Sequence, residues 1–156
     1  MRREQRNPPN RFEERRLELL EPAPEVQLEI TEVEARQVLS DNRSPDIPFR
    51  YSLNPYQGCY HGCVYCYARP SHQYLGLGAG TDFERRLQVK MNAPALLARR
   101  FESRAWTGEV IVFSGNTDCY QPLEARYELT RACLRLCLAY RNPVQIITKG
   151  GVIMRD

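Results

Sequence analysis

The chain has 156 residues, of which 42% are hydrophobic and 26% are charged, and its formal net charge is +3. These proportions are typical of one ordinary globular domain and exclude wholesale disorder. No apolar run approaches the ~18 residues of a membrane span and no secretory leader is recognisable, so we expect a cytoplasmic protein without a membrane partner.

The first 48 residues are predicted to form an N-terminal extension rather than part of the core. Prolines and asparagines interrupt this segment and leave room for a charged helix over residues 12–20 and a second short helix over residues 32–39. Residues 44–48 are expected to form turns, because each proline removes a backbone donor and biases its predecessor towards extended geometry.

From residue 49 onwards the pattern predicts alternating strands and helices. Residues 49–53 and 87–91 alternate apolar and polar side chains and predict two short strands. Asn92 is placed to cap a helix that ends at Phe101. Two further strands, over residues 110–113 and 144–147, are expected to be buried on both faces.

A single helix over residues 123–140, with Leu138 on its apolar stripe, is predicted between the last two strands. Strands connected by helices in this order indicate successive βαβ units and a parallel sheet. Polar loops follow three of the strands, and in parallel sheets chemistry collects at the carboxyl ends of the strands. The chain stops just beyond the last strand, which would therefore present an unpaired edge, and it is too short for a closed barrel of over ~200 residues.

Three of the six cysteines crowd into one loop. A disulfide framework is not expected without a signal peptide. Cys59, Cys63 and Cys66 form a C-x₃-C-x₂-C motif, and Gly58 and Gly62 allow the backbone to turn tightly around it. Three thiolates can hold three irons of a cubane iron–sulfur cluster, and the fourth iron then keeps the open position that a catalytic metal site needs.

This motif, placed after the first strand of a βα series and with an aromatic residue directly before the last cysteine, resembles the radical S-adenosylmethionine (radical SAM) superfamily. Four flanking stretches are similar to one bacterial branch, that of spore photoproduct lyase, often labelled "DNA repair photolyase-like". They are S-P-D-I-P-F (44–49), N-P-Y-Q-G-C (54–59), Y-A-R-P-S-H-Q-Y-L-G (67–76) and D-F-E (82–84). The resemblance covers roughly residues 44–156.

The resemblance implies an α/β fold: the first half of a partial (βα)₆ barrel over residues 49–156, truncated after its third core strand and preceded by the extension of residues 1–48. It also implies that a [4Fe–4S] cluster on Cys59, Cys63 and Cys66 cleaves S-adenosylmethionine reductively. The resulting 5′-deoxyadenosyl radical would abstract hydrogen from a substrate that the sequence does not identify, with a nucleic-acid lesion as one candidate. An electron donor such as flavodoxin or ferredoxin is implied as a partner.

Five residues are implied to hold S-adenosylmethionine. Tyr65 would lie along the adenine. Ser114, Thr117 and Asp118 would accept hydrogen bonds from the methionyl amino group, because a protonated amine needs acceptors. Lys149 would pair with the carboxylate. Four of these residues also have a simpler interpretation: plain packing for Tyr65, turn and cap bonding for Thr117 and Asp118, and a solvated charge for Lys149.

The downstream cysteines have different expected roles. By resemblance, Cys119 is a candidate for the thiol that returns a hydrogen atom to a substrate radical, although small buried cysteines are common in cores. Cys133 and Cys137 are four residues apart on the predicted helix, and this spacing favours core packing.

Several alternatives remain open. The three clustered cysteines with His61 or His72 would suit zinc, and Cys63 with Cys66 would suit a thioredoxin-type dithiol, which leaves Cys59 unexplained. A non-catalytic iron–sulfur or zinc module, an inactive fragment, and a metal-free nucleic-acid-binding protein are the rival functions, although the small net charge does not demand a nucleic-acid partner. We expect the isolated chain to be poorly folded or inactive.

Overall fold

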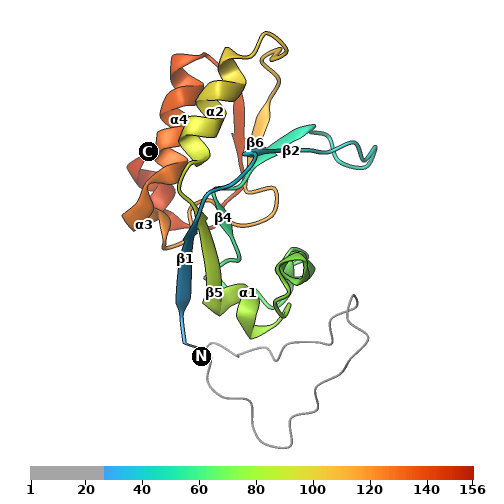
Figure 1. Ribbon diagram of the computed structural model, residues 1–156, viewed down its shortest axis with the longest axis vertical. Coiled ribbons are helices and arrows are strands. Elements are labelled where there is room, and N and C mark those ends of the chain that lie inside the picture. The colour runs from blue at the N-terminus through green and yellow to red at the C-terminus, as the bar shows by residue number, and fades with distance from the viewer. Residues whose placement is uncertain (1–26) are drawn as a thin grey trace, which may run out of the picture.

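The computed structural model describes residues 27–156. The helix expected over residues 12–20 lies outside this range. The described residues form a mixed α/β structure with two mixed sheets and no closed barrel (Figure 1).

The larger sheet carries the three parallel strands that the sequence predicts. Its order is β2, β3, β6 and β7, which span Leu39–Asp41, Tyr51–Leu53, Ile111–Phe113 and Val144–Ile146. β3, β6 and β7 are parallel, whereas β2 is antiparallel to β3. The register pairs Leu53 with Phe113 and Phe113 with Ile146, so the three polar loops leave the sheet at one edge.

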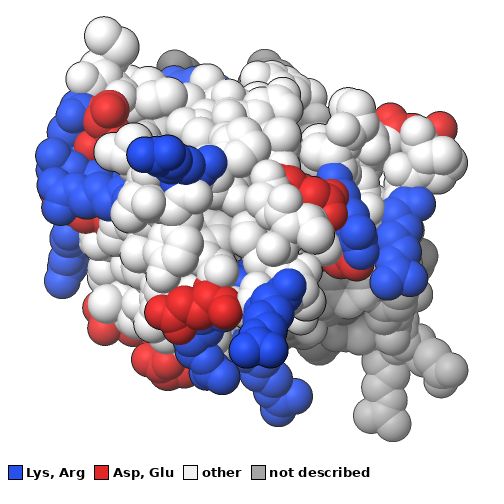
Figure 2. All heavy atoms as spheres, turned by 90° about the horizontal axis from the view of Figure 1, so that it is seen from above, with Lys and Arg blue, Asp and Glu red and all other residues white. Residues whose placement is uncertain are grey.

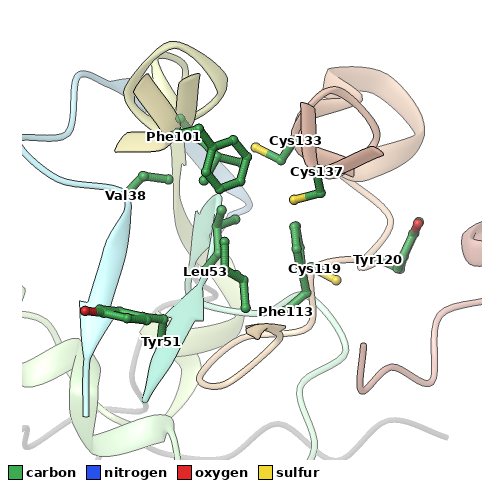
Figure 3. Close-up of a cluster of buried hydrophobic side chains, with 12 residues drawn as sticks. Val38, Tyr51, Leu53, Phe101, Phe113, Cys119, Tyr120, Cys133 and Cys137 are labelled. Atoms are coloured by element: carbon green, nitrogen blue, oxygen red, sulfur yellow. The ribbon is translucent and has the colours of Figure 1, made fainter. Parts of the chain in front are cut away.

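Helices α2 (Ala93–Glu102) and α4 (Leu129–Ala139) contact each other beside this sheet. The main core lies between them and the strands (Figure 3), and it contains Leu53, Phe113, Cys133 and Cys137. All three residues of β6 are fully buried, as predicted, but Val110, which the prediction included in this strand, lies outside it and is 44% exposed. Cys133 and Cys137 both point into this core, which confirms their predicted packing role.

The prediction of a single helix over residues 123–140 is wrong. The chain forms two helices, α3 (Glu124–Tyr127) and α4, separated by a break at Glu128, whose φ is 50°. The buried Glu124 carboxylate accepts hydrogen bonds from the first amides of α4, those of Thr130 (2.9 Å) and Arg131 (3.0 Å). Those amides have no partner within the helix, and Glu124 satisfies them. Leu138, expected on the apolar stripe, is 80% exposed. It follows the buried Cys137 by one residue, and one residue turns the helix by about 100°.

The smaller sheet has the order β1 (Glu29–Val33), β5 (Arg86–Lys90) and β4 (Tyr56–Gln57). In β5, Leu87 and Val89 are buried between half-buried neighbours, which confirms a half-exposed strand here, although Met91, the last residue of the predicted strand, lies outside β5 and is 39% exposed. Three short helices complete the described chain: the 3₁₀ helices η1 (Arg69–Leu75) and η2 (Gly151–Arg155), and α1 (Thr81–Arg85).

The helix expected over residues 32–39 is also wrong, because these residues include the end of β1 and the start of β2. β1 pairs with β5 and β2 with β3, so residues 29–33 and 39–41 belong to the two sheets, and Val38 between them is part of the main core. These long-range ladders satisfy the backbone more completely than a short isolated helix would. Asn92 directly precedes α2 as predicted, but its side chain does not cap the helix. Instead, its Oδ1 accepts the Ala35 N–H and its Nδ2 donates to the Ala35 carbonyl oxygen (2.9 Å each).

β7 is at the edge of its sheet and is not buried, contrary to the prediction. Val144 is 39% exposed and the following Ile147 is 56% exposed. The expected unpaired edge is confirmed within the described residues, where β7 pairs only with β6. No helix between residues 27 and 156 is both long and apolar enough to cross the bilayer.

Candidate metal and cofactor site

The cysteine loop begins at a position that only glycine can occupy. Gly58 has φ +79°, and a Cβ there would lie 2.6 Å from Leu87 Cδ2 and 2.9 Å from the Phe83 carbonyl oxygen. The next residue, Cys59, donates its backbone N–H to the same Phe83 oxygen (2.8 Å). The close approach of the loop to α1 and β5 therefore depends on a residue without a side chain.

Two backbone turns bring the cysteines back along the same loop. The Gly62 N–H donates to the Cys59 carbonyl (3.1 Å), and the Cys66 N–H donates to the Cys63 carbonyl (3.2 Å). Each spacer of the motif therefore contains one tight turn. Cys59 is buried, whereas Cys63 and Cys66 are half-buried.

A buried ion pair holds the backbone of the cysteine loop in place. Arg69 donates from Nε to the Cys63 carbonyl (2.9 Å) and from Nη1 to the Gly80 carbonyl (2.7 Å). Its Nη2 lies 3.0 Å from the Glu84 carboxylate, and both side chains are at most 6% exposed. Sequence reasoning missed this pair, although both residues lie in stretches that carry the family resemblance.

Lys149, at the carboxyl end of β7, reaches the cysteine loop. Its Nζ lies 3.5 Å from the Tyr65 hydroxyl and 5.5 Å from the centre of the Tyr65 ring. A hydrogen bond with the Cys63 thiol raises the pKa of Lys149 above its usual value. The structure thus brings together three predicted site residues from two strand ends, although Lys149 and Tyr65 are 84 residues apart in the sequence.

Asp118 joins the loop after β6 to the segment that carries Lys149. Its Oδ1 accepts hydrogen bonds from the Thr148 hydroxyl (2.6 Å) and the Tyr120 N–H (2.9 Å), and its Oδ2 accepts one from the Lys149 N–H (3.0 Å). His61 Nε2 is 3.9 Å from the same Oδ2. Asp118 therefore fixes the backbone beside the cysteine loop as well as forming a local turn.

The other two predicted acceptors also make bonds within their loop. Ser114 Oγ accepts the Cys119 N–H (2.8 Å), at a left-handed backbone position with φ 69°. Thr117 is buried and donates its hydroxyl to the Tyr56 carbonyl (2.7 Å). A hydroxyl oxygen with one such bond still has a free lone pair, so both side chains keep some capacity to accept.

Asn54 links the ends of β3 and β6 and was not assigned a role from the sequence. Its Oδ1 accepts the backbone N–H groups of Asn116 (3.1 Å) and Thr117 (3.2 Å). The Tyr67 hydroxyl adds a second link by donating to the Gly115 carbonyl (2.6 Å). The sequence signal was the Asn-Pro pair directly after the predicted strand.

Cys119 does not join the cysteine loop. It is fully buried in the main core together with Cys133 and Cys137, whereas Cys59 and Cys66 belong to a separate cluster around Phe83. Burial raises the pKa of Cys119 to about 12, so the thiol stays protonated at neutral pH.

His72 is buried and points to the backbone of β5. Its ring Nε2 lies 2.8 Å from the Arg86 carbonyl oxygen, which can only accept, so Nε2 carries the proton. This bond occupies one of the two ring nitrogens. It gives no support to a zinc set that includes His72.

The metal-binding capacity of the loop depends on its three thiols. Across residues 27–156, no three His, Cys, Asp or Glu side chains lie close enough together to hold a metal ion as they stand. The donor chemistry nevertheless fits an iron–sulfur cluster, because all three residues are free thiols on one loop with two turns between them. A cluster would require the thiols to turn towards one another. Burial raises the pKa of Cys59 to about 11, so a bound metal would also have to displace its proton.

Comparison with known proteins gives relatives without an assigned activity. Uncharacterized proteins of Mycobacterium tuberculosis and Mycobacterium bovis are 42% identical over 110 residues, which is 70% of this chain and 32% of theirs. An uncharacterized protein of Methanocaldococcus jannaschii is 29% identical over 129 residues, 83% of this chain and 46% of its own length. The chain thus spans about a third to a half of the length of these relatives. No family model and no solved structure matches it.

Proposed function

We propose that the chain is part of a radical SAM enzyme in which Cys59, Cys63 and Cys66 hold a [4Fe–4S] cluster. The observation that carries this proposal is the meeting of Lys149 with Cys63 and Tyr65 at the carboxyl edge of the parallel strands. A structural zinc loop has no need of a lysine beside a cysteine ligand. A site that also binds a carboxylate-bearing cofactor does need a cation there.

When bound, such a cluster supplies the electron that cleaves S-adenosylmethionine reductively. Three thiolates, with no fourth cysteine in the loop, leave one coordination position for a cofactor. The Arg69–Glu84 pair holds the backbone of Cys63, so this ligand is positioned by a buried support rather than by solvent-exposed loop contacts.

Lys149 and Tyr65 are the residues best placed to orient S-adenosylmethionine. Lys149 offers a flexible point charge for the methionyl carboxylate, and Tyr65, which is 81% exposed, offers an uncovered ring for the adenine. The same edge carries Ser114, Thr117 and Asp118. Their side-chain oxygens, beyond the bonds that they already make, would accept hydrogen bonds from the methionyl amino group.

The same proposal includes a partial (βα)₆ barrel. Its support is the parallel order β3, β6, β7, with helices α2 and α4 in the two connections and the polar loops at one edge. The exposed edge of β7 is where a further parallel strand would add to this sheet.

Cys119 remains a candidate hydrogen donor in this proposal. Its support is a protonated thiol, since a weak S–H bond suits hydrogen return to a radical. A nucleic-acid lesion as substrate and flavodoxin or ferredoxin as electron donor rest on the family resemblance alone.

The test is S-adenosylmethionine cleavage by the chain after anaerobic reconstitution with iron and sulfide and reduction with dithionite. We expect 5′-deoxyadenosine to form, in contrast to the inactive chain expected from the sequence, because Lys149, Tyr65 and the cysteine loop meet within residues 27–156. Lys149→Gln should raise the KM for S-adenosylmethionine roughly tenfold or more, because a charge-assisted hydrogen bond is worth about 1.5–3 kcal/mol. Lys149→Arg should recover part of that loss.

A reconstituted chain that contains iron but never forms 5′-deoxyadenosine would contradict the enzymatic proposal and favour a binding module. One tightly bound zinc, with no iron retained, would favour the structural metal module instead.

A further inference from the structure

A basic pocket lies at the opposite end of the parallel strands from the cysteine loop. It has a volume of about 500 Å³ and lies between α2 and the β2–β3 pair. One wall is formed by a single face of α2, with Leu96, Arg99 and Arg100 at helical spacing, and by Ser103 directly after the helix. Tyr51, the first residue of β3, places the pocket at the amino end of that strand.

The side chains that line this pocket carry more positive than negative charges. Its lining includes four arginines, Arg36, Arg50, Arg99 and Arg100, and one acid, Asp41. Arg50 lies 3.1 Å from Asp41 and 3.4 Å from Glu109, so it is compensated. Among residues 27–156, Arg36, Arg99 and Arg100 have no acidic partner. An arginine does not lose its proton in a protein, so three positive charges face this pocket.

Aromatic rings hold one of these guanidinium groups in place. Arg100 lies 5.7 Å from the centre of the Tyr51 ring and 5.2 Å from that of Trp106, and one of its nitrogens is 3.5 Å from the Tyr51 hydroxyl. The two rings pack on each other at 5.1 Å. Stacking fixes the plane of a guanidinium while leaving most of its N–H groups free, which is the arrangement that binds oxyanions.

We propose that this pocket binds a small organic phosphate, such as a molecule carrying a diphosphate group. Three guanidinium groups without an acidic partner among the described residues match the two to three negative charges of a phosphate monoester or diphosphate better than the single charge of a carboxylate. The buried Val38 and half-buried Leu96 supply an apolar floor for the rest of the molecule.

Size and surface charge favour a small ligand over a nucleic acid. The volume falls within the ~300–1,000 Å³ typical of small-molecule pockets. Figure 2 shows the molecule from above, where the basic side chains form separate groups, several of them beside acidic ones, rather than one continuous stripe. A basic patch or stripe is the typical footprint of a nucleic-acid-binding surface, and this face does not show one.

The chain contains a built-in reporter for this pocket, because Trp106 is its single tryptophan and contacts Arg100. Inorganic pyrophosphate and uridine diphosphate would be titrated into the metal-free chain while tryptophan fluorescence and heat are recorded. We expect saturable binding at one site. Arg99→Gln and Arg100→Gln should each weaken it about tenfold or more.

The control is Arg135→Gln, because Arg135 is exposed on α4 and lies outside this pocket. It should change the affinity less than about twofold. Circular dichroism would confirm that each variant is folded, which we expect because Arg99 and Arg135 are exposed and Arg100 is only half-buried.

Three outcomes would overturn the proposal. One is the absence of saturable binding of either phosphate, and another is wild-type affinity in both Arg99→Gln and Arg100→Gln. The third is a short single-stranded oligonucleotide that binds more than about tenfold more tightly than pyrophosphate and is released by the same substitutions, because the phosphates would then belong to a polymer. None of these results depends on iron or S-adenosylmethionine.

Discussion

Arg69 and Glu84 form an ion pair of 3.0 Å in which the exposed side-chain fractions are 6% and 1%. Arg86 and Glu29 form a second ion pair with the same 3.0 Å separation, but their exposed fractions are 39% and 57%. The two pairs share one separation and differ in burial, and only the buried one also supports the cysteine loop.

Glu84→Gln is expected to destabilise the chain by about 3–5 kcal/mol, because it leaves the Arg69 charge buried without its partner. Glu29→Gln should cost no more than about 1 kcal/mol, since surface pairs contribute little. Urea unfolding of both variants makes the comparison. Equal costs would show that the buried pair has no special role.

Gly58→Ala is expected to prevent normal folding of the cysteine loop, because its Cβ would lie 2.9 Å from the backbone carbonyl oxygen of Phe83 as well as 2.6 Å from Leu87 Cδ2. Gly76 provides a matched control: its φ is +70°, close to the +79° of Gly58, but a Cβ there would have nothing within 4 Å. Gly76→Ala should therefore cost only the left-handed backbone strain of about 1–2 kcal/mol. Thermal unfolding would separate the two, and similar costs would contradict the steric account.

Stability is expected to fall as the pH drops below about 6.5, the ordinary pKa of histidine. Burial lowers the pKa of His72 in the folded chain, and it outweighs the opposing effects of the hydrogen bond to the Arg86 carbonyl and of the Asp82 charge. Between the lowered folded value and the unfolded value, the unfolded chain binds more protons, so acid favours unfolding. Above the unfolded pKa the imidazole is neutral in both states, and the stability that the neutral His72 contributes is then fully present.

Urea midpoints measured from pH 8 to pH 5 would test this dependence. His72→Gln keeps a donor for the Arg86 carbonyl but does not titrate, so it should reduce the slope below pH 6.5. An unchanged slope in the variant would assign the acid sensitivity to other groups.

The parts of the fold predicted well are those with strong local patterns. The apolar run that forms β6, the alternation that forms β5 and the polar loops at one sheet edge all follow from side-chain periodicity. β1, β2 and the break at Glu128 depend instead on partners distant in sequence or on a buried side chain. Local propensity carries no information about those partners.

The candidate site divides in the same way. The cysteines and Lys149 were recognisable as residue types at strand ends, and the structure brings Lys149 to Cys63. Arg69, Glu84 and Asn54 act by positioning other residues, Arg69 and Asn54 through backbone groups and Glu84 through Arg69. The sequence does not show which distant groups they bind, although the Asn-Pro pair marks Asn54 as the end of a strand.

Asp118→Ala is expected to loosen the segment that carries Lys149, because the Lys149 N–H loses its acceptor at 3.0 Å. Hydrogen exchange at the Lys149 and Tyr120 amides should become roughly tenfold faster or more, since each amide loses one hydrogen bond. Asp46→Ala, in an exposed turn, is the control. Unchanged exchange at Lys149 would contradict the positioning role of Asp118.

The iron and sulfide content of the anaerobically reconstituted chain tests the central claim most directly. We predict about four irons per chain, lost in Cys59→Ala, Cys63→Ala and Cys66→Ala but retained in Cys137→Ala, whose thiol lies in the main core. A Cys63→Ala variant that keeps its full iron content would contradict the assignment of the cysteine loop as the cluster site.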